Sequence, residues 1–134
     1  RNVSYFGCGP YESYEDKHYL STVGNYDDVV DNMRVHYVRP QESGSHAFSR
    51  KVRVNNIINS ISISSEKDFS FSITPYDQYN LPGHDVDLID SGFVYLNIDY
   101  RMKGVGSRSC GPQIQDKYRL LEKEMNYSIY IKVE

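Results

Sequence analysis

Strict alternation of apolar and polar residues is the clearest pattern along the chain. Successive side chains of a β-strand point to opposite faces, so a half-buried sheet needs an apolar residue at every second position. Residues 57–64 fit this pattern, with Ser on one face and three isoleucines on the other, Ile57, Ile61 and Ile63. Phe and Ile alternate with Ser in the same way at 69–73. Residues 65–68 are polar and charged, which predicts a hairpin connection between two strands.

Two later segments predict strands of different character. Residues 93–100 are apolar on both faces, which is typical of a central strand covered from both sides. Residues 127–133 alternate and predict a last strand. A further apolar segment at 118–121 precedes it, with 122–126 as the turn.

Glycine and proline punctuate the rest of the chain, where backbone bends are expected. Residues 27–37 fit either a short helix or a strand, and 76–81 fit a single helical turn. Many short strands with little helix predict an all-β fold, an antiparallel β-sandwich. The length of 134 residues and the thirteen Tyr agree with one β-rich domain over 1–134.

Charge and hydropathy exclude two classes of partner. The net charge is -3 and the Lys and Arg residues are scattered, which disfavours nucleic acid. No apolar stretch approaches the roughly 18 residues that span a bilayer, and the start lacks the layout of a secretory signal. Because the chain begins at Arg1, already inside what looks like a structural motif, we expect a segment of a longer cytoplasmic protein.

The two cysteines, Cys8 and Cys110, lie near opposite ends of the sequence. They lack the short paired spacings of a zinc site or of a disulfide-rich secreted scaffold. We expect two free thiols in preference to a disulfide. No Cys/His signature supports Cys110 as a nucleophile.

Three motifs together resemble one family. Residues 5–14, Tyr-Phe-Gly-Cys-Gly-Pro-Tyr-Glu-Ser-Tyr, resemble the Tyr-Phe-Gly-x-Gly-Pro-x-Glu-Asn-Tyr signature of the C-terminal domain of large β-galactosidases in glycoside hydrolase family 2. Residues 37–44, Tyr-Val-Arg-Pro-Gln-Glu-Ser-Gly, are similar to that family's Tyr-x-x-Pro-Gln-Glu-Asn-Gly. Ser replaces the usual Asn in both. Arg50 falls where the family keeps an Arg, whereas Lys51 departs from the aromatic often found beside it.

The third motif, at 104–112, is Gly-Val-Gly-Ser-Arg-Ser-Cys-Gly-Pro, similar to the family's Gly-x-Gly-x-x-Ser-Trp/Cys-Gly-Pro loop. His84 stands in the place of a fourth, weaker element. The order and spacing of these motifs cover the chain from end to end. The resemblance implies a supersandwich of the galactose-mutarotase-like type, with this chain as a C-terminal fragment of the enzyme.

The resemblance also implies a division of labour. Retaining glycoside hydrolysis needs two carboxylates about 5 to 5.5 Å apart, which in this family come from a (β/α)₈ barrel absent here. We therefore expect no catalytic residue in this chain and no hydrolysis by the fragment alone. The full enzyme would cleave terminal β-D-galactosides such as lactose and would assemble as an oligomer. The barrel would be this domain's partner. The Mg and Na of the enzyme would be held in other domains, so we expect no cofactor in this chain.

The candidate substrate-binding residues are Cys110, Arg108 and His84. By resemblance, Cys110 stands where a Trp packs against the sugar, and a thiol offers less surface. The alternatives are a small buried thiol at Cys110, a solvated Arg108 that makes no hydrogen bonds to sugar hydroxyls, and a His84 that holds its loop.

Several charged residues have structural explanations. Four carboxylates that could be drawn as catalytic acids sit in turns or at strand ends, where such groups commonly cap backbone N–H groups or face solvent: Glu12, Glu42, Asp85 and Asp99. Arg39, Glu42 and Arg50 are expected to brace the sandwich through ion pairs or backbone contacts.

Two other functional classes stay open. A free-standing carbohydrate-binding module is one, because β-sandwiches host many lectin-like sites. A structural or oligomer-forming sandwich is the other, and a large exposed apolar patch would be its sign.

Overall fold

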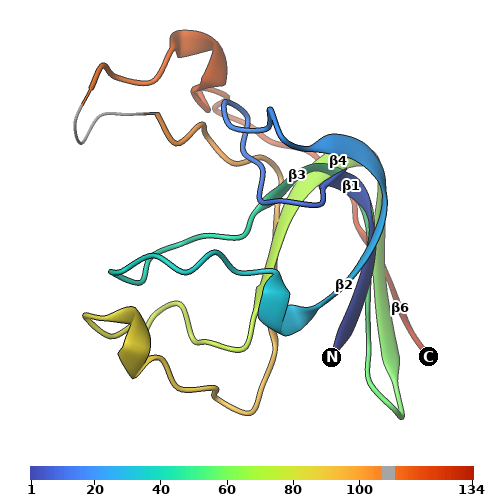
Figure 1. The fold of residues 1–134 in the computed structure, drawn as a ribbon. Coiled ribbons are helices and arrows are strands. Elements are labelled where there is room, and N and C mark those ends of the chain that lie inside the picture. Colours follow the sequence, from blue (N-terminus) through green and yellow to red (C-terminus); the bar gives the residue numbers. More distant parts are fainter. Residues whose placement is uncertain (107–110) are drawn as a thin grey trace.

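The protein's structure, a computed structural model, describes residues 1–106 and 111–134. Its six strands form one antiparallel sheet in the order β2-β1-β3-β4-β5, with β6 also paired to β4 (Figure 1). The strands are β1 Asn2–Gly9, β2 Thr22–Val29, β3 His46–Asn55, β4 Ser60–Thr74, β5 Tyr95–Asp99 and β6 Tyr130–Val133. Three 3-10 turns complete the regular structure, η1 Val30–Asn32, η2 Asp85–Asp87 and η3 Asp116–Tyr118. The predicted all-β antiparallel class is confirmed, and the sandwich stays a prediction.

The hairpin predicted at 65–68 is wrong, because β4 runs through these residues without turning. Ser49 of β3 pairs with Phe69 of β4, and Lys51 pairs with Ser64. Between these two pairs, β4 therefore contains more residues than β3. The extra residues of β4 form a bulge, which bends a strand and needs no turn. The polar side chains of 66–68 are exposed there. The polarity of this segment reflects exposure at a bulge.

The actual hairpin connects β3 to β4 through residues 56–59. The Asn56 side-chain oxygen accepts hydrogen bonds from the backbone N–H groups of Ile58 and Asn59, both at 2.8 Å. Asn favours such turns because its side chain bonds to the backbone two residues further on. Ile57 therefore lies fully exposed in the turn and does not share a strand face with Ile61, contrary to the prediction.

The two last strands pair with the same edge of β4. β5 lies beside 70–74 and β6 lies beside 61–64. The prediction of a central strand at 93–100 is wrong, since β5 pairs with β4 alone among the described residues and is an edge strand. β6 is shorter than predicted, and η3 with irregular chain replaces the strand expected at 118–121.

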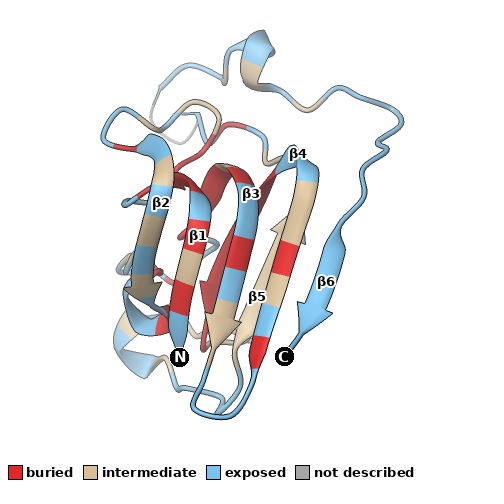
Figure 2. Cartoon of the chain, turned by 90° about the vertical axis from the view of Figure 1, so that its right-hand side faces the viewer, coloured by how far each residue is buried: buried red, intermediate tan, exposed pale blue. Residues whose placement is uncertain are grey.

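The core lies on one face of the sheet. Its buried side chains come from the strands and from η1 and its C-cap, namely Val3, Tyr5, Val30, Met33, Val52, Ile63, Phe69, Phe71 and Ile73. Long connecting segments extend from this face, which we call the loop face (Figure 1). Figure 2 shows the opposite face, where exposed positions interrupt β3 and β4 and cover all of β6. No helix in the described part of the chain has the length and apolar character needed to cross a bilayer.

Candidate functional site

The carboxylate of Glu12 joins the first two motifs on the loop face. It accepts hydrogen bonds from the Tyr37 hydroxyl at 2.7 Å and from the Gly44 backbone N–H at 2.9 Å, and it contacts the Lys17 ammonium. Tyr37 and Gly44 are the two ends of the second motif. One side chain therefore ties the turn after β1 to the segment that leads into β3.

The surroundings of Glu12 keep it ionised. Burial alone would raise the pKa of Glu12, but the hydrogen bonds from Lys17, Gly44 and Tyr37 outweigh burial and hold the pKa below its usual range. Gly44 has φ +74, and a Cβ there would lie 2.3 Å from the Met33 carbonyl oxygen. Only glycine can turn its N–H toward Glu12 at this position without strain.

Ser13 takes the place of the family's usual Asn and is fully buried. Its hydroxyl donates to the Cys8 carbonyl at 3.2 Å and accepts from the Ala47 N–H at 2.9 Å, while its own N–H donates to the Ser45 carbonyl at 2.6 Å. The short side chain therefore connects the end of β1 to the start of β3. Cys8 is a free, buried thiol, and burial raises its pKa.

Glu42 has a different environment from Glu12. The Tyr14 hydroxyl donates to Glu42 at 2.8 Å. Desolvation raises the pKa of Glu42, the hydrogen bond from Tyr14 opposes that rise, and the nearby charges of Glu12 and Asp99 add to it. Glu42 therefore holds its proton to higher pH than an ordinary glutamate.

Asp16 binds the described start of the third motif. Its two carboxylate oxygens accept the backbone N–H groups of Val105 at 2.8 Å and Gly106 at 2.9 Å. A Cβ on Gly104 would lie 2.6 Å from the Asp16 carboxyl carbon, so the close approach depends on glycine. The Gly104 N–H donates to the Tyr118 carbonyl at 3.0 Å. We call this arrangement of Asp16, Val105 and Gly106 the Asp16 clamp.

A hollow of about 560 Å³ lies beside the Asp16 clamp. Aromatic, amide and charged side chains line it, including Lys17, Tyr19, Gln113, Gln115 and Tyr118. The Tyr19 ring is 95% exposed and stacks on His18 with 6.0 Å between ring centroids. Exposed aromatic faces and amide groups are the side chains that contact sugar C–H faces and hydroxyls.

Comparison with known proteins identifies the family. The family described as beta galactosidase small chain matches residues 1–131. The chain belongs to this family. The predicted resemblance to β-galactosidases is confirmed.

Similar proteins named beta-galactosidase include that of Actinobacillus pleuropneumoniae, 42% identical over 124 residues, which are 91% of this chain and 12% of the relative. That of Staphylococcus xylosus is 37% identical over 135 residues, 97% of this chain and 13% of the relative. That of Kluyveromyces lactis is 34% identical over 139 residues, 99% of this chain and 13% of the relative. This small-chain sequence thus spans about one eighth of the length of these relatives.

The predicted substrate-binding residues fall in different parts of this small-chain structure. Arg108 and Cys110 lie outside the described residues. His84 is exposed and precedes η2, where its carbonyl accepts the Asp87 N–H at 3.1 Å. The next residue, Asp85, pairs with the His36 imidazole at 2.8 Å, and its N–H donates to the Val38 carbonyl at 3.1 Å.

Figure 1 shows the segment at 75–92 at the opposite end of the loop face from residues 101–106 and 111–118. His84 and the Asp16 clamp are thus separate features. Two of the three residues expected to brace the sandwich have side-chain partners in the described structure: Arg50 pairs with Asp68 at 2.7 Å, and Glu42 accepts a hydrogen bond from Tyr14.

Sequence reasoning missed Asp16. Its partners lie 89 and 90 positions further along the chain, a separation that no local pattern reveals. The available signal was the pair Gly104 and Gly106, since two glycines so close together favour a tight backbone approach by another group.

Proposed function

We propose that this chain is a non-catalytic part of a β-galactosidase that hydrolyses terminal β-D-galactosides such as lactose, and that it shapes the rim of the active site. Membership of the small-chain family and the names of its relatives support the activity. The observation that carries the non-catalytic role is the use of two carboxylates as structural hydrogen-bond acceptors, Glu12 of the first motif and Asp16, which lies two residues after that motif.

A retaining glycosidase needs one carboxylic acid that can protonate the leaving oxygen and one carboxylate free to attack the sugar. Glu12 already accepts hydrogen bonds from Tyr37 and Gly44, and Asp16 accepts two backbone N–H groups. Each carboxylate thus holds neighbouring backbone or side-chain groups in place, which is a structural role. The acid and the nucleophile would belong to the barrel of the large chain.

Glu42 shares one property with a general acid, because desolvation raises its pKa, as it does for Glu15 and Asp99. Its partner is the Tyr14 hydroxyl, and the nearby Glu12 is held ionised by other donors. Glu42 therefore serves to position Tyr14 and the motif around it.

The chain's contribution to the reaction is positional. The Asp16 clamp holds the backbone at Val105 and Gly106, immediately before Arg108 and Cys110 in the sequence. In the proposed role, Arg108 and Cys110 contact the substrate. His84 either contacts the substrate as well or supports its own loop. Holding such a loop in one conformation lowers the entropy lost when a substrate binds.

The proposal for the metals is that the Mg and Na of the full enzyme are held by other domains. In 1–106 and 111–134 no three His, Cys, Asp or Glu side chains come together as ligands would.

The test is a set of variants in the full-length enzyme that contains this chain. Glu12→Gln and Glu42→Gln are expected to leave kcat for a chromogenic galactoside within about fivefold, whereas loss of a catalytic acid costs about 10² to 10⁴. Asp16→Asn is expected to raise KM several-fold and to change kcat less, because it loosens a binding loop.

Glu66→Gln, on the exposed bulge of β4, is the matched control and should change neither constant. A loss of kcat of about a thousandfold in Glu12→Gln or Glu42→Gln, in enzyme that still folds by circular dichroism, would contradict the non-catalytic role.

A further inference from the structure

An apolar groove of about 830 Å³ lies open between the first residues of β4, the start of β5 and β6. Its apolar lining residues are Val54, Ile61, Ile63, Phe93, Val94, Leu96, Ile131 and Val133. Phe93 is 72% exposed, Ile131 61% and Val133 70%. Three large apolar side chains thus meet solvent within one concave surface.

The groove continues the hydrophobic core across the sheet. Val52 pairs with Ile63, and Ile63 pairs in turn with Ile131. Val52 is fully buried and Ile63 is 7% exposed, yet Ile131 at the end of the same row is mostly exposed. The next row, Val54, Ile61 and Val133, loses cover in the same direction. Along these two rows the apolar surface of the core therefore continues into solvent-exposed side chains of β6.

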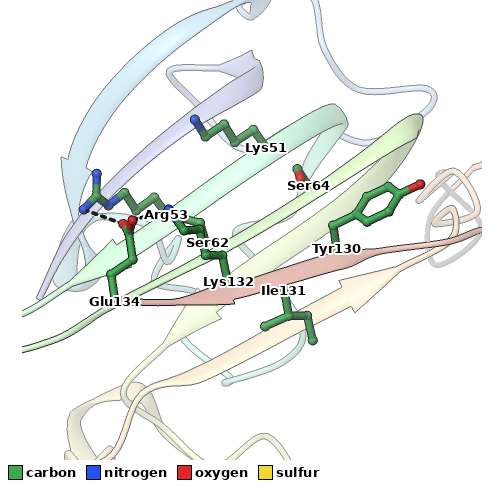
Figure 3. A pocket seen from close by; sticks show the side chains of 8 residues that line it. All are labelled: Lys51, Arg53, Ser62, Ser64, Tyr130, Ile131, Lys132 and Glu134. Carbon is green, nitrogen blue, oxygen red and sulfur yellow. Dashed lines mark hydrogen bonds and ion pairs between the residues drawn. The ribbon is translucent and has the colours of Figure 1, made fainter.

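The other face of the same strands is polar. Figure 3 shows Lys51, Arg53, Ser62 and Ser64 on one side of the sheet, while Ile131 points away from them. Arg53 pairs there with Glu134 at 3.3 Å. Strand β6 thus carries one apolar and one polar face, the pattern of a strand with one buried side.

The physical driving force for covering this groove is substantial. Fully burying a Val, Ile or Phe side chain stabilises by about 1.5–3 kcal/mol. Contiguous apolar surface with polar surroundings marks an interaction site. Asn55, Asn56, Asn59 and Arg1 provide the polar surroundings at one end of the groove.

We propose that the groove is the docking site for an apolar segment of the β-galactosidase large chain. The family is described as a small chain, and this sequence covers only 12–13% of its relatives, so most of their polypeptide lies outside it. The large chain is the partner whose apolar surface continues the core over Phe93, Ile131 and Val133. This inference rests on the proposed function, because it needs the same enzyme.

Cysteine accessibility in the full-length enzyme tests the docking site. Ile131→Cys and Val133→Cys place a thiol in the groove, and Lys132→Cys places one between them on the polar face. Iodoacetamide labelling of each site is followed by mass spectrometry of the corresponding peptide. Labelling at 131 and 133 should be at least about 100-fold slower than at 132, because a covered thiol reacts only when the interface opens locally.

Two outcomes would overturn the inference. Labelling at 131 and 133 within about tenfold of that at 132 means that the groove is open or that both faces are covered alike. Protection that disappears on dilution means that a second copy of the protein fills the groove.

Hydrolysis measured on the same samples separates this inference from the proposed function. Fast labelling in an active enzyme removes the docking site alone. Slow labelling together with a catalytic loss in Glu12→Gln removes the non-catalytic role alone.

Discussion

The two halves of β4 have the same alternating sequence and opposite environments. Residues 69–74 are buried on both faces, including Phe71 at 0% exposure and even Ser70 at 2%. Residues 60–64 are buried in part, and Ile61 is 38% exposed. Each half has β3 on one side and a short strand on the other. Alternation therefore predicts which side chains share a face of the sheet. Whether those side chains are buried depends on which other parts of the protein pack on that face.

The difference arises at the bulge. Beyond it, 69–74 lie under the loop face, where His46 and Tyr5 pack on Phe71 with ring centroids 5.2 Å away in each case. Before it, Ser60, Ile61 and Ile63 line the open apolar groove. The bulge in β4 thus separates a part of the strand whose side chains are buried from a part whose apolar side chains line an open groove.

Phe71→Ala should have the largest effect on this difference. Truncating a fully buried Phe costs about 3–5 kcal/mol, since it removes contacts and leaves a cavity. Hydrogen exchange of the peptide over 69–74 in the full-length enzyme should accelerate by the corresponding factor. Ser62→Ala in the other half is the control, expected to stay within about 0.5 kcal/mol. Equal effects in the two variants would show that the halves are equally packed.

Lowering the pH should have the second largest effect, a loss of stability in the buried half of β4, residues 69–74. Burial lowers the pKa of His46, and its hydrogen bond to the Cys8 carbonyl only partly opposes this. The folded protein therefore binds the proton less readily than the unfolded chain, so the stability from His46 is complete above a pH of about 6.5 and declines as the pH falls below it.

Exchange at 69–74, corrected for its intrinsic pH dependence, should rise below this pH in the natural protein. His46→Gln should flatten that rise. A profile identical in both proteins would assign the acid sensitivity to another group.

Removing the ion pair beside the bulge should have the smallest effect on stability. Arg50 and Asp68 meet at 2.7 Å with side chains about half exposed. Exposed pairs contribute about 0.2–1 kcal/mol and are screened by salt. Arg50→Ala should therefore change exchange at the bulge slightly, and 0.5 M NaCl should erase the difference. A salt-independent loss above about 2 kcal/mol would mean that the pair fixes the bend.

The sequence could predict the strand pattern of β4 but not its continuity. Polar residues at 65–68 suit both a turn and an exposed bulge, and the choice depends on the register with β3, where Lys51 faces Ser64 and Ser49 faces Phe69. A register between strands is not encoded in one strand's alternation. The real turn had its own local signal in Asn55, Asn56 and Asn59.

The motifs of the site were visible in the sequence, but their contacts were not. Glu12 was recognised as a turn carboxylate, and it does accept the Gly44 N–H. Its partner lies 32 positions away, and the partners of Asp16 lie much further. Contacts over such separations follow from the three-dimensional path of the chain, so the clamp could be found only in the structure.

The outer edge of β6 has a consequence for handling the protein. Ser60 and Glu134 exchange both backbone hydrogen bonds, at 2.7 and 2.9 Å. In an antiparallel ladder the next residue inward then turns its N–H and C=O away from the partner strand, so those of Val133 and Ile131 point away from β4, and no other strand pairs with β6 among the described residues. Such an edge is a template for strand addition. Under the proposed docking on the large chain, this chain produced alone should therefore tend to form ordered aggregates, and co-expression with the large chain should keep it dispersed.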